Sequence, residues 1–326
     1  MRLLLRRLAD AIVLYWLVVT LTFLLLRAAP GDPATLLVPP TASAADAERL
    51  RAELGLDAPL VVQYARWTSG VLIGDLGESF ASRRPVGAVL GEALPVSLGL
   101  GLVSLTLTFL IGVTLGFVQA ARRGSALDAT LTVTTTAIFA APSFWLALSL
   151  IALCTYGAAA WGFPPWLRLP AFGMRDPASE ARGWAALGDI ARHAVLPVVT
   201  LTAIGAAGIA RYARTILADL MELPFVRTAR AKGVGAARVH ARHVLRVALP
   251  PIIVLFALSL PGVLAGSVFV ETVFAWPGMG RLMVTAIGAR DYPVVMGATV
   301  LYAALVIVAN LLGDLALPLA DPRRRQ

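Results

Sequence analysis

The chain has 326 residues, of which 58% are hydrophobic and 14% are charged, and its mean hydropathy is +0.79. Soluble domains carry about 25% charged residues, so this composition excludes an ordinary soluble globular protein and places most of the chain in a lipid bilayer. The net charge of +9 would point to nucleic acid in a soluble protein, but the loop charges described below explain it without such a partner.

Six stretches of the sequence lack charged residues over a length that suits a membrane-spanning helix, which needs about 20 mostly apolar residues. They are 11–26, 93–121, 129–167, 194–210, 247–270 and 292–313. The third is too long for one helix and is expected to end near Tyr156. Strand-like alternation is absent, and an open backbone finds no hydrogen-bond partner in lipid. The sequence therefore predicts an all-α integral membrane protein with six transmembrane helices.

The first stretch has a second interpretation, because Arg2, Arg6 and Arg7 precede it as they would precede the apolar part of a signal peptide. However, the apolar run extends from about residue 8 to residue 29, and no small-x-small cleavage site follows it cleanly. We therefore expect an uncleaved first helix.

The outer segment 30–93 is expected to contain local structure. Residues 44–54 have the composition of a short helix that Gly55 ends, and Pro59 is suited to open a second one. Four residues spaced by three or four form the apolar face of that second helix: Leu60, Tyr64, Trp67 and Val71. The sequence GDLGESF at 74–80 predicts a turn-rich loop.

The second outer segment, 157–193, contains Trp161, Trp166 and Trp184. Tryptophans beside a span are most simply explained as an interfacial belt. Stacking on a bound ligand is the alternative.

The distribution of basic residues predicts the orientation in the membrane. With six spans, both termini lie on one side, and that side carries 16 Lys and Arg residues against 12 on the other. Five of those 12 lie in the long segment 30–93, where the positive-inside bias is weak, so the comparison becomes 16 against 7. We therefore expect both termini in the cytoplasm. The net positive charge of the chain is then explained by basic residues on the cytoplasmic side of the membrane.

The cytoplasmic segment 211–249 carries eight of these basic residues. Arg238, Arg242 and Arg246 recur every four residues, so they share one face of a helix. Such a face suits anionic lipid phosphates and equally suits a cytoplasmic protein partner. The pattern alone does not separate these two interpretations.

Catalytic and cofactor motifs are missing from the sequence. The only lysine, Lys232, does not belong to a Walker A loop, so we expect no ATP hydrolysis and no cofactor. His240 and His243 are three residues apart, but no carboxylate or thiolate accompanies them, which argues against a metal site. The single cysteine, Cys154, excludes an intramolecular disulfide. The chain is not expected to be an enzyme.

A few residues within the spans predict packing. Asn310 and Asp314 lie four apart on one helix face and are candidates for polar residues in the interior of the bundle. Pro142 predicts a kink, and Gly112 with Gly116 predicts a close helix crossing.

Segment 225–251, FVRTARAKGVGAARVHARHVLRVALPP, closely resembles the cytoplasmic docking loop of ABC importer permeases. More specifically, it is similar to the membrane subunit with a long first outer loop in the dipeptide/oligopeptide/nickel importer family. Other blocks agree in chain order: LLLRAAPGDPA, LGLDAPLVVQYARW, GDLGESFASRRPV, VFVETVFAWPGMGRLMVTAIGARDYPVV and ADPRRR. The resemblance covers nearly the whole chain and implies the type-1 ABC importer permease fold.

The resemblance also assigns a site, within a docking loop at about 222–249. Its expected ATPase-docking residues are Arg227, Thr228, Ala229, Arg230, Ala231, Lys232 and Gly233. Arg227 replaces the glutamate of the general Glu-Ala-Ala motif, as is usual in the peptide branch, and Gly233 matches that motif's glycine. Gly233 is expected to permit a sharp bend between two short helices. Pro224, Phe225 and Val247 depart from the family's usual residues.

The family implies an importer of two permeases, two cytoplasmic ABC ATPase subunits and an extracytoplasmic substrate-binding protein, in a bacterial inner membrane. The implied domains are an N-terminal helix with its outer segment (1–93), a five-helix transmembrane domain (94–320) and a cytoplasmic tail (321–326). Peptides are the expected cargo, and nickel chelates, glutathione and opines are alternatives. A stand-alone secondary transporter is the rival hypothesis, but the inverted repeat and broken helices that it would need are not found.

Overall fold

The computed structural model describes residues 2–28, 43–264 and 268–320. Over these residues the chain is helical and forms no strand, apart from one isolated bridge between Glu78 and Pro85. Six helical stretches are long and apolar enough to cross a bilayer: Ala9–Ala28, Val86–Ala121, Ser143–Ala160, Gly183–Met221, Arg242–Val263 and Tyr292–Leu311. The expected all-α membrane protein with six spans is confirmed.

The third apolar run of the sequence forms two helices instead of one. α6 (Ala126–Ala140) ends where Ala141 adopts an extended backbone with ψ of 134°, and α7 (Ser143–Ile151) begins directly after Pro142. A proline disfavours the helical conformation of the residue before it, which explains the break. The stretch of crossing length is Ser143–Ala160, so the expected start of this span at residue 129 was wrong, while its end lies near the expected Tyr156.

Two helices are much longer than a bilayer requires. α5 (Val86–Ala121) has 36 residues and α9 (Gly183–Met221) has 39. At 1.5 Å per residue they measure about 54 and 58 Å, whereas the hydrocarbon core is about 30 Å thick. Both helices therefore project beyond the hydrocarbon.

By its contacts the chain divides into two compact units, 1–97 with 277–308 and 98–276 with 309–326. α5 and α15 (Tyr292–Ala320) contribute to both units. The domain organisation expected from the sequence stays a prediction, since its tail lies outside the described residues and these units reflect packing alone.

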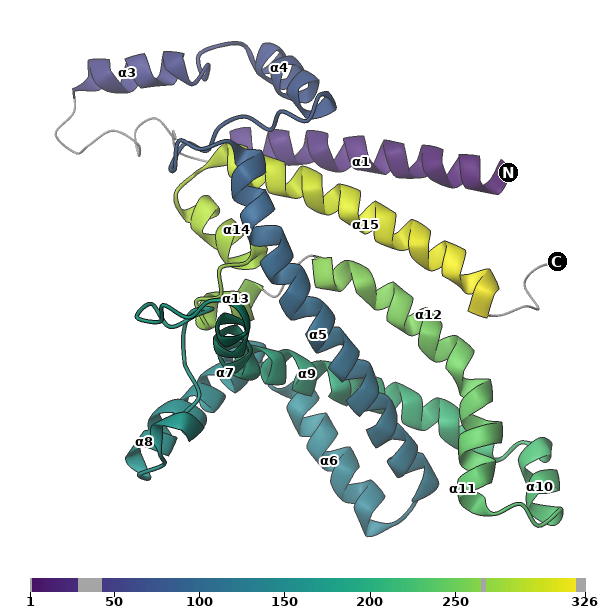
Figure 1. Cartoon of the computed structure of the whole chain (residues 1–326). Coiled ribbons are helices and arrows are strands. Elements are labelled where there is room, and N and C mark those ends of the chain that lie inside the picture. The colour runs from purple at the N-terminus through teal and green to yellow at the C-terminus, as the bar shows by residue number, and fades with distance from the viewer. Residues whose placement is uncertain (1, 29–42, 265–267, 321–326) are drawn as a thin grey trace. The chain divides into compact units, whose positions relative to one another are not determined.

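The outer segment of the first unit forms the two expected helices, α3 (Ala44–Glu53) and α4 (Leu60–Leu72), shown in Figure 1. Ser43 and Asp46 form a capping box at the start of α3. The backbone turns after α3 at Gly55, where φ is +64°.

The apolar face of α4 packs only in part. Tyr64 and Trp67 contact the Phe23 ring of α1 (Arg2–Ala28), with ring centroids 5.3 and 5.8 Å apart. Leu60, however, is 53% exposed, so it does not belong to the buried face that the spacing predicted. The remaining helix of this unit is α14 (Met279–Gly288), which packs with the beginnings of α5 and α15.

The second unit is built on a close crossing of α5 and α9. A side chain at Gly112 would place its Cβ 2.7 Å from Ile209 Cβ, and one at Gly116 would lie 2.6 Å from the carbonyl oxygen of Ala210. Only glycine therefore allows the two helices to approach this closely, which confirms the crossing expected from the pair.

Several short elements and the long helix α12 complete the second unit. They are the π-helical segment Ala152–Gly157, α8 (Ala158–Ala160), the 3₁₀ turn Pro165–Leu167, α10 (Pro224–Ala231), α11 (Ala236–Arg238), the π-helical segment Val239–Val244, α12 (Leu245–Leu264) and α13 (Val268–Val273). Trp161, Trp166 and Trp184 are exposed, as an interfacial belt requires, although the belt itself stays a prediction.

Candidate functional site

The candidate docking residues begin on α10, a short helix with one apolar and one polar face. Pro224 occupies its first turn, where a missing N–H is harmless. Val226 and Ala229 are buried and belong to the same apolar cluster as Leu217 of α9. The bundle therefore holds α10 by its inner face, and the opposite face is exposed.

Six of the seven residues expected to dock are exposed: Arg227, Thr228, Arg230, Ala231, Lys232 and Gly233. Ala229 is the seventh, and it is buried with only 7% exposed. It belongs to the apolar cluster that supports α10, and its docking role stays a prediction.

A Schellman motif ends α10 and explains the glycine that follows. The Gly233 N–H donates to the Arg230 carbonyl over 2.9 Å, and the Val234 N–H donates to the Ala229 carbonyl over 3.2 Å. This pairing needs a left-handed residue at position 233, and Gly233 has φ of +78°. Val234 packs against the same apolar cluster as Ala229. The bend expected at Gly233 is confirmed.

The second element after the bend is longer than expected. α11, the π-helical segment and α12 follow without interruption from Ala236 to Leu264, so the bend joins one short helix to the helix that enters the membrane. Arg238, Arg242 and Arg246 are exposed along it, as their spacing predicted. The sequence placed a separate short helix after the bend and began the membrane span at residue 247, whereas the structure joins the two into one helix.

Two histidines lie on the buried side of this helix. The His240 ring meets the Phe117 ring edge-on at 5.8 Å. Burial lowers the pKa of His240, and the Arg230 guanidinium lowers this pKa further. His240 Nε2 and His243 Nδ1 are buried without a hydrogen-bond partner among the described residues. Among the residues that the structure describes, no group of three or more His, Cys, Asp or Glu side chains could hold a metal ion.

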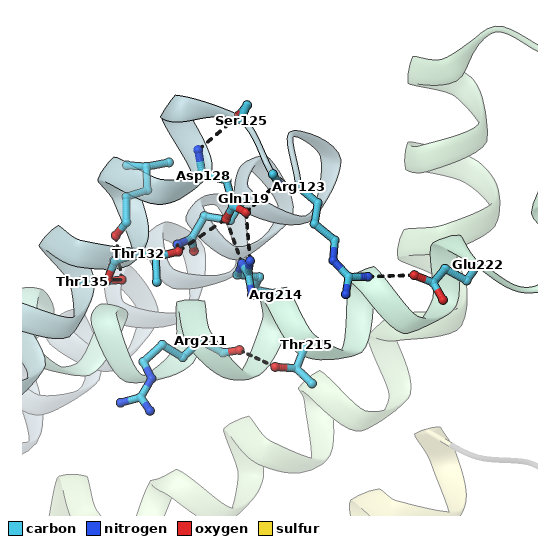
Figure 2. Close-up of polar contacts among 12 residues, drawn as sticks. Gln119, Arg123, Ser125, Asp128, Thr132, Thr135, Arg211, Arg214, Thr215 and Glu222 are labelled. Atoms are coloured by element: carbon cyan, nitrogen blue, oxygen red, sulfur yellow. Dashed lines mark hydrogen bonds and ion pairs between the residues drawn. The ribbon is translucent and has the colours of Figure 1, made fainter.

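An ion pair with a buried carboxylate and a partly exposed guanidinium lies on the same stretch of α9 that supports α10, the side chains of Asp128 and Arg214 being 5% and 33% exposed. The Arg214 guanidinium donates two hydrogen bonds of 2.9 Å to the two carboxylate oxygens of Asp128 on α6. Figure 2 shows the two groups facing each other across the helices. The hydrogen bonds from Arg214 lower the pKa of Asp128 to about 2, although burial opposes this shift. Asp128 is therefore charged at neutral pH.

The same carboxylate fixes the turn between α5 and α6. Asp128 accepts a hydrogen bond of 3.1 Å from the Gly124 N–H and one of 3.4 Å from the Thr132 hydroxyl. The Asp128 N–H in turn donates to the Ser125 hydroxyl at the start of α6. One side chain thus connects the turn, α6 and α9.

A second ion pair lies nearby but is exposed. Arg123, after the end of α5, contacts Glu222, after the end of α9, over 2.7 Å, and the two side chains are 60% and 69% exposed (Figure 2). Exposed pairs of this kind contribute little to stability. The two ion pairs have similar chemistry but differ strongly in burial.

Comparison with known families identifies the kind of protein that carries these features. The family of binding-protein-dependent transport system inner membrane components matches residues 112–326. The family of the N-terminal part of such membrane components matches residues 1–101. The chain belongs to this family of transport permeases.

Curated relatives of this permease match over almost its whole length. The oligopeptide transport system permease protein AppB of Bacillus subtilis (strain 168) is 38% identical, over 93% of this chain and 92% of the relative. The di/tripeptide transport system permease protein DppB of Pseudomonas aeruginosa (strain UCBPP-PA14) is 36% identical, over 98% and 97%.

A solved structure supports the fold of the permease. An inward-facing structure of the MetNI methionine ABC transporter matches with a TM-score of 0.53 and 21% identity, covering 72% of this chain and 96% of that chain. The expected type-1 ABC importer permease fold is confirmed.

The structure does not test the two residues expected in the bundle interior. Asn310 is exposed, and the side chain of Asp314 lies outside the described residues. Their interior position stays a prediction.

Sequence reasoning missed Asp128 and Arg214. Ser125 and Asp128 have the spacing of a helix cap, which could have drawn attention to Asp128. Nothing local in the sequence indicates its partner 86 residues later.

Proposed function

We propose that this permease forms half of the translocation pathway of an ATP-driven importer of peptides. The observation that carries the proposal is the match with oligopeptide and di/tripeptide permeases over more than nine-tenths of each chain. The N-terminal family model, which covers residues 1–101, includes the outer segment. The peptide-branch features of segment 225–251 agree with this cargo.

The proposed partners are a homologous second permease, two cytoplasmic ABC ATPase subunits and an extracytoplasmic binding protein. The geometry of α10 supports the ATPase contact. Its inner face is fixed in the bundle, and its outer face presents Arg227, Arg230 and Lys232 beside the Gly233 bend. A short, rigid, basic element of this kind suits a groove with acidic residues, because charge complementarity guides and orients association.

The proposed location is a bacterial inner membrane with both termini in the cytoplasm. The excess of basic residues on the side of the termini supports this orientation.

The proposed mechanism is alternating access driven from the ATPase side. Closure of the ATPases moves α10, and α10 shares its apolar cluster with α5, α9 and the helix that runs from Ala236 to Leu264. A movement of α10 therefore displaces these long helices. In this way ATPase closure at the cytoplasmic surface changes the side of the membrane to which the translocation pathway is open.

Reconstitution tests this function. The permease is co-expressed with its three kinds of partner, and the purified complex is placed in proteoliposomes. Uptake of radiolabelled di-, tri- and oligopeptides is expected only with ATP and binding protein. Uptake by the permease alone, driven by an ion gradient, would show a secondary transporter. ATP-driven uptake of a nickel chelate, glutathione or an opine, without peptide uptake, would refute the peptide assignment alone.

A further inference from the structure

α6 is an unusual helix because polar groups hold it in place. Its 15 residues measure about 22 Å, less than the thickness of the hydrocarbon core. The two side chains buried on it, Asp128 and Thr135, are both polar. The Thr135 hydroxyl bonds to carbonyls of its own helix, so Asp128 is the buried residue of α6 that reaches another helix.

A second contact between α6 and α9 is less directional. The Phe139 ring lies 3.3 Å from the position that a Cβ would take at Gly208, and the Arg211 guanidinium lies 5.2 Å from the centre of this ring. A ring face accepts a cation over a range of positions, whereas two parallel hydrogen bonds fix the relative position of both groups. The register of α6 on α9 therefore depends on Asp128 and Arg214.

Arg214 lies on α9 between residues that support α10. Ala213 and Leu217 are fully buried in the apolar cluster that contains Val226 and Ala229 of α10. The backbone N–H of Arg214 also lies 2.8 Å from the position of a Cβ at Gly116 of α5. This one turn of α9 thus contacts α5, α6 and the cluster that supports α10.

Stability alone does not require a buried ion pair at this place. Removing the Asp128 carboxylate and part of the Arg214 side chain from water is costly, and well-packed apolar residues often stabilise a fold as much or more. An apolar contact does not fix the register of the two helices, because it tolerates small shifts along the helix axis. A bidentate ion pair does fix it, because both hydrogen bonds are lost when either helix shifts.

We propose that Asp128 and Arg214 are positioning residues that couple ATP hydrolysis to transport, by making α6 move together with α9 and α5 as one rigid body. This proposal rests on the proposed function, in which α10 receives the movement. Without the pair, α10 still engages its partner and the ATPases still turn over, but α6 no longer follows α9.

The test compares the buried pair with the exposed pair Arg123–Glu222, which also joins an arginine and a carboxylate. In the reconstituted complex, Asp128→Asn is expected to lower the peptide accumulated per ATP hydrolysed by about tenfold, within the usual range of coupling free energies. The amount of assembled complex and the rate of ATP hydrolysis should stay near wild type. Arg123→Gln should leave the ratio unchanged, and Asp128→Glu, which keeps the charge, should recover most of it.

A second measurement needs no cargo and keeps the proposal separate from the proposed function. Nitroxide labels are attached at Thr130 on α6 and Tyr212 on α9, both exposed, in a chain whose Cys154 is replaced by Ala. The label-to-label distance distribution should be narrow and unchanged by ATP in the wild-type complex, and broad with Asp128→Asn. Should Asp128→Asn assemble poorly, the same distance is measured on the permease alone in nanodiscs.

Two results would overturn the proposal. One is a wild-type ratio of peptide to ATP in Asp128→Asn, and the other is a label distance that stays narrow in this variant. Absence of ATP-driven peptide uptake by the wild-type complex would instead refute the proposed function, and the distance measurement would still decide the role of the ion pair.

Discussion

The Ser79 hydroxyl donates a hydrogen bond of 2.5 Å to the Asp291 carboxylate, 212 residues later in the chain. The same carboxylate accepts the N–H groups of Phe80 and Ala81 over 3.0 and 3.2 Å. Asp291 follows α14, and it is 3% exposed. The turn-rich loop that the sequence predicted at 74–80 is therefore held by a carboxylate that local sequence does not reveal.

Replacing this carboxylate should loosen the outer loop. Asp291→Asn keeps the shape but removes the charge that strengthens three hydrogen bonds, so we expect a loss of about 2–4 kcal/mol in stability. Limited proteolysis of the purified protein should cut faster near Ser79, and the thermal midpoint in detergent should fall. Glu92→Gln breaks the exposed ion pair with Arg84 and should change neither value appreciably. Equal effects of the two substitutions would contradict the role of Asp291.

A single methyl group should disturb the crossing of α5 and α9. Gly116→Ala places a Cβ 2.6 Å from a backbone oxygen and 2.8 Å from a backbone nitrogen of α9, and backbone cannot yield as a flexible side chain does. We expect a loss of about 1–3 kcal/mol, measured as a lower thermal midpoint.

Gly99 provides the control for this substitution, because it lies on the same helix with no atom within 4 Å of an added Cβ. Gly99→Ala should be neutral or slightly stabilising, since alanine favours helix more than glycine does. A fall in the thermal midpoint of similar size for Gly99→Ala would show that helix propensity, and not the close approach, explains the result.

The bend after α10 should not tolerate a β-branched residue. Gly233 has φ of +78° and open space around it, so Gly233→Val strains the backbone by about 1–3 kcal/mol without any clash. Uptake in the assembled importer should fall steeply, while the affinity of the separate binding protein for cargo stays the same. Gly235→Val is the control, because Gly235 has φ of −59°. Wild-type uptake and ATPase coupling in Gly233→Val would refute the docking assignment, and the basic face would then be explained by lipid contact.

The orientation can be checked with a thiol reagent that does not cross membranes. Ser43→Cys and Gln326→Cys are made separately in chains that carry Cys154→Ala. In intact cells with a permeable outer membrane, we expect labelling at position 43 and none at position 326, because the basic residues place the termini inside. The reverse pattern would overturn the topology.

The isolated permease should not hydrolyse ATP. Its only lysine, Lys232, is followed by Gly-Val-Gly and lies in the turn after α10, where no phosphate-binding loop is formed. ATP turnover is measured on the purified chain against a mock preparation, and we also expect the chain to be less stable without its partner permease. Turnover above the mock level would refute this prediction.

The sequence predicted the parts of the fold that depend on local composition. Spans follow from gaps between charges, and the close crossing follows from Gly112 and Gly116. Pro142 predicted a kink, whereas the structure has a full break there between α6 and α7. Gly233 could be placed at a bend because only glycine readily takes the left-handed conformation that a Schellman motif needs.

The parts that the sequence did not predict depend on distant partners. Neither Asp128 nor Asp291 is surrounded by residues that indicate what it binds, since their partners lie 86 and 212 residues away. The helix after Gly235 is longer than expected for another reason: the short helix and the span that were predicted separately are continuous from Ala236 to Leu264. Leu60 was wrongly expected on the buried face of α4. Residue spacing predicts which side chains share a helix face, but it does not predict how much of that face a neighbouring helix covers.

The division of labour on α10 has an evolutionary consequence. Val226 and Ala229 hold the helix, while Arg227 and Arg230 face outward, so substitutions on the outer face leave the support intact. A cell with several related importers must keep each membrane subunit from binding the wrong ATPase. On the proposed docking of α10 to the ATPase, substitutions at a few outward positions of α10 change this pairing after gene duplication and leave the buried support of the helix in place.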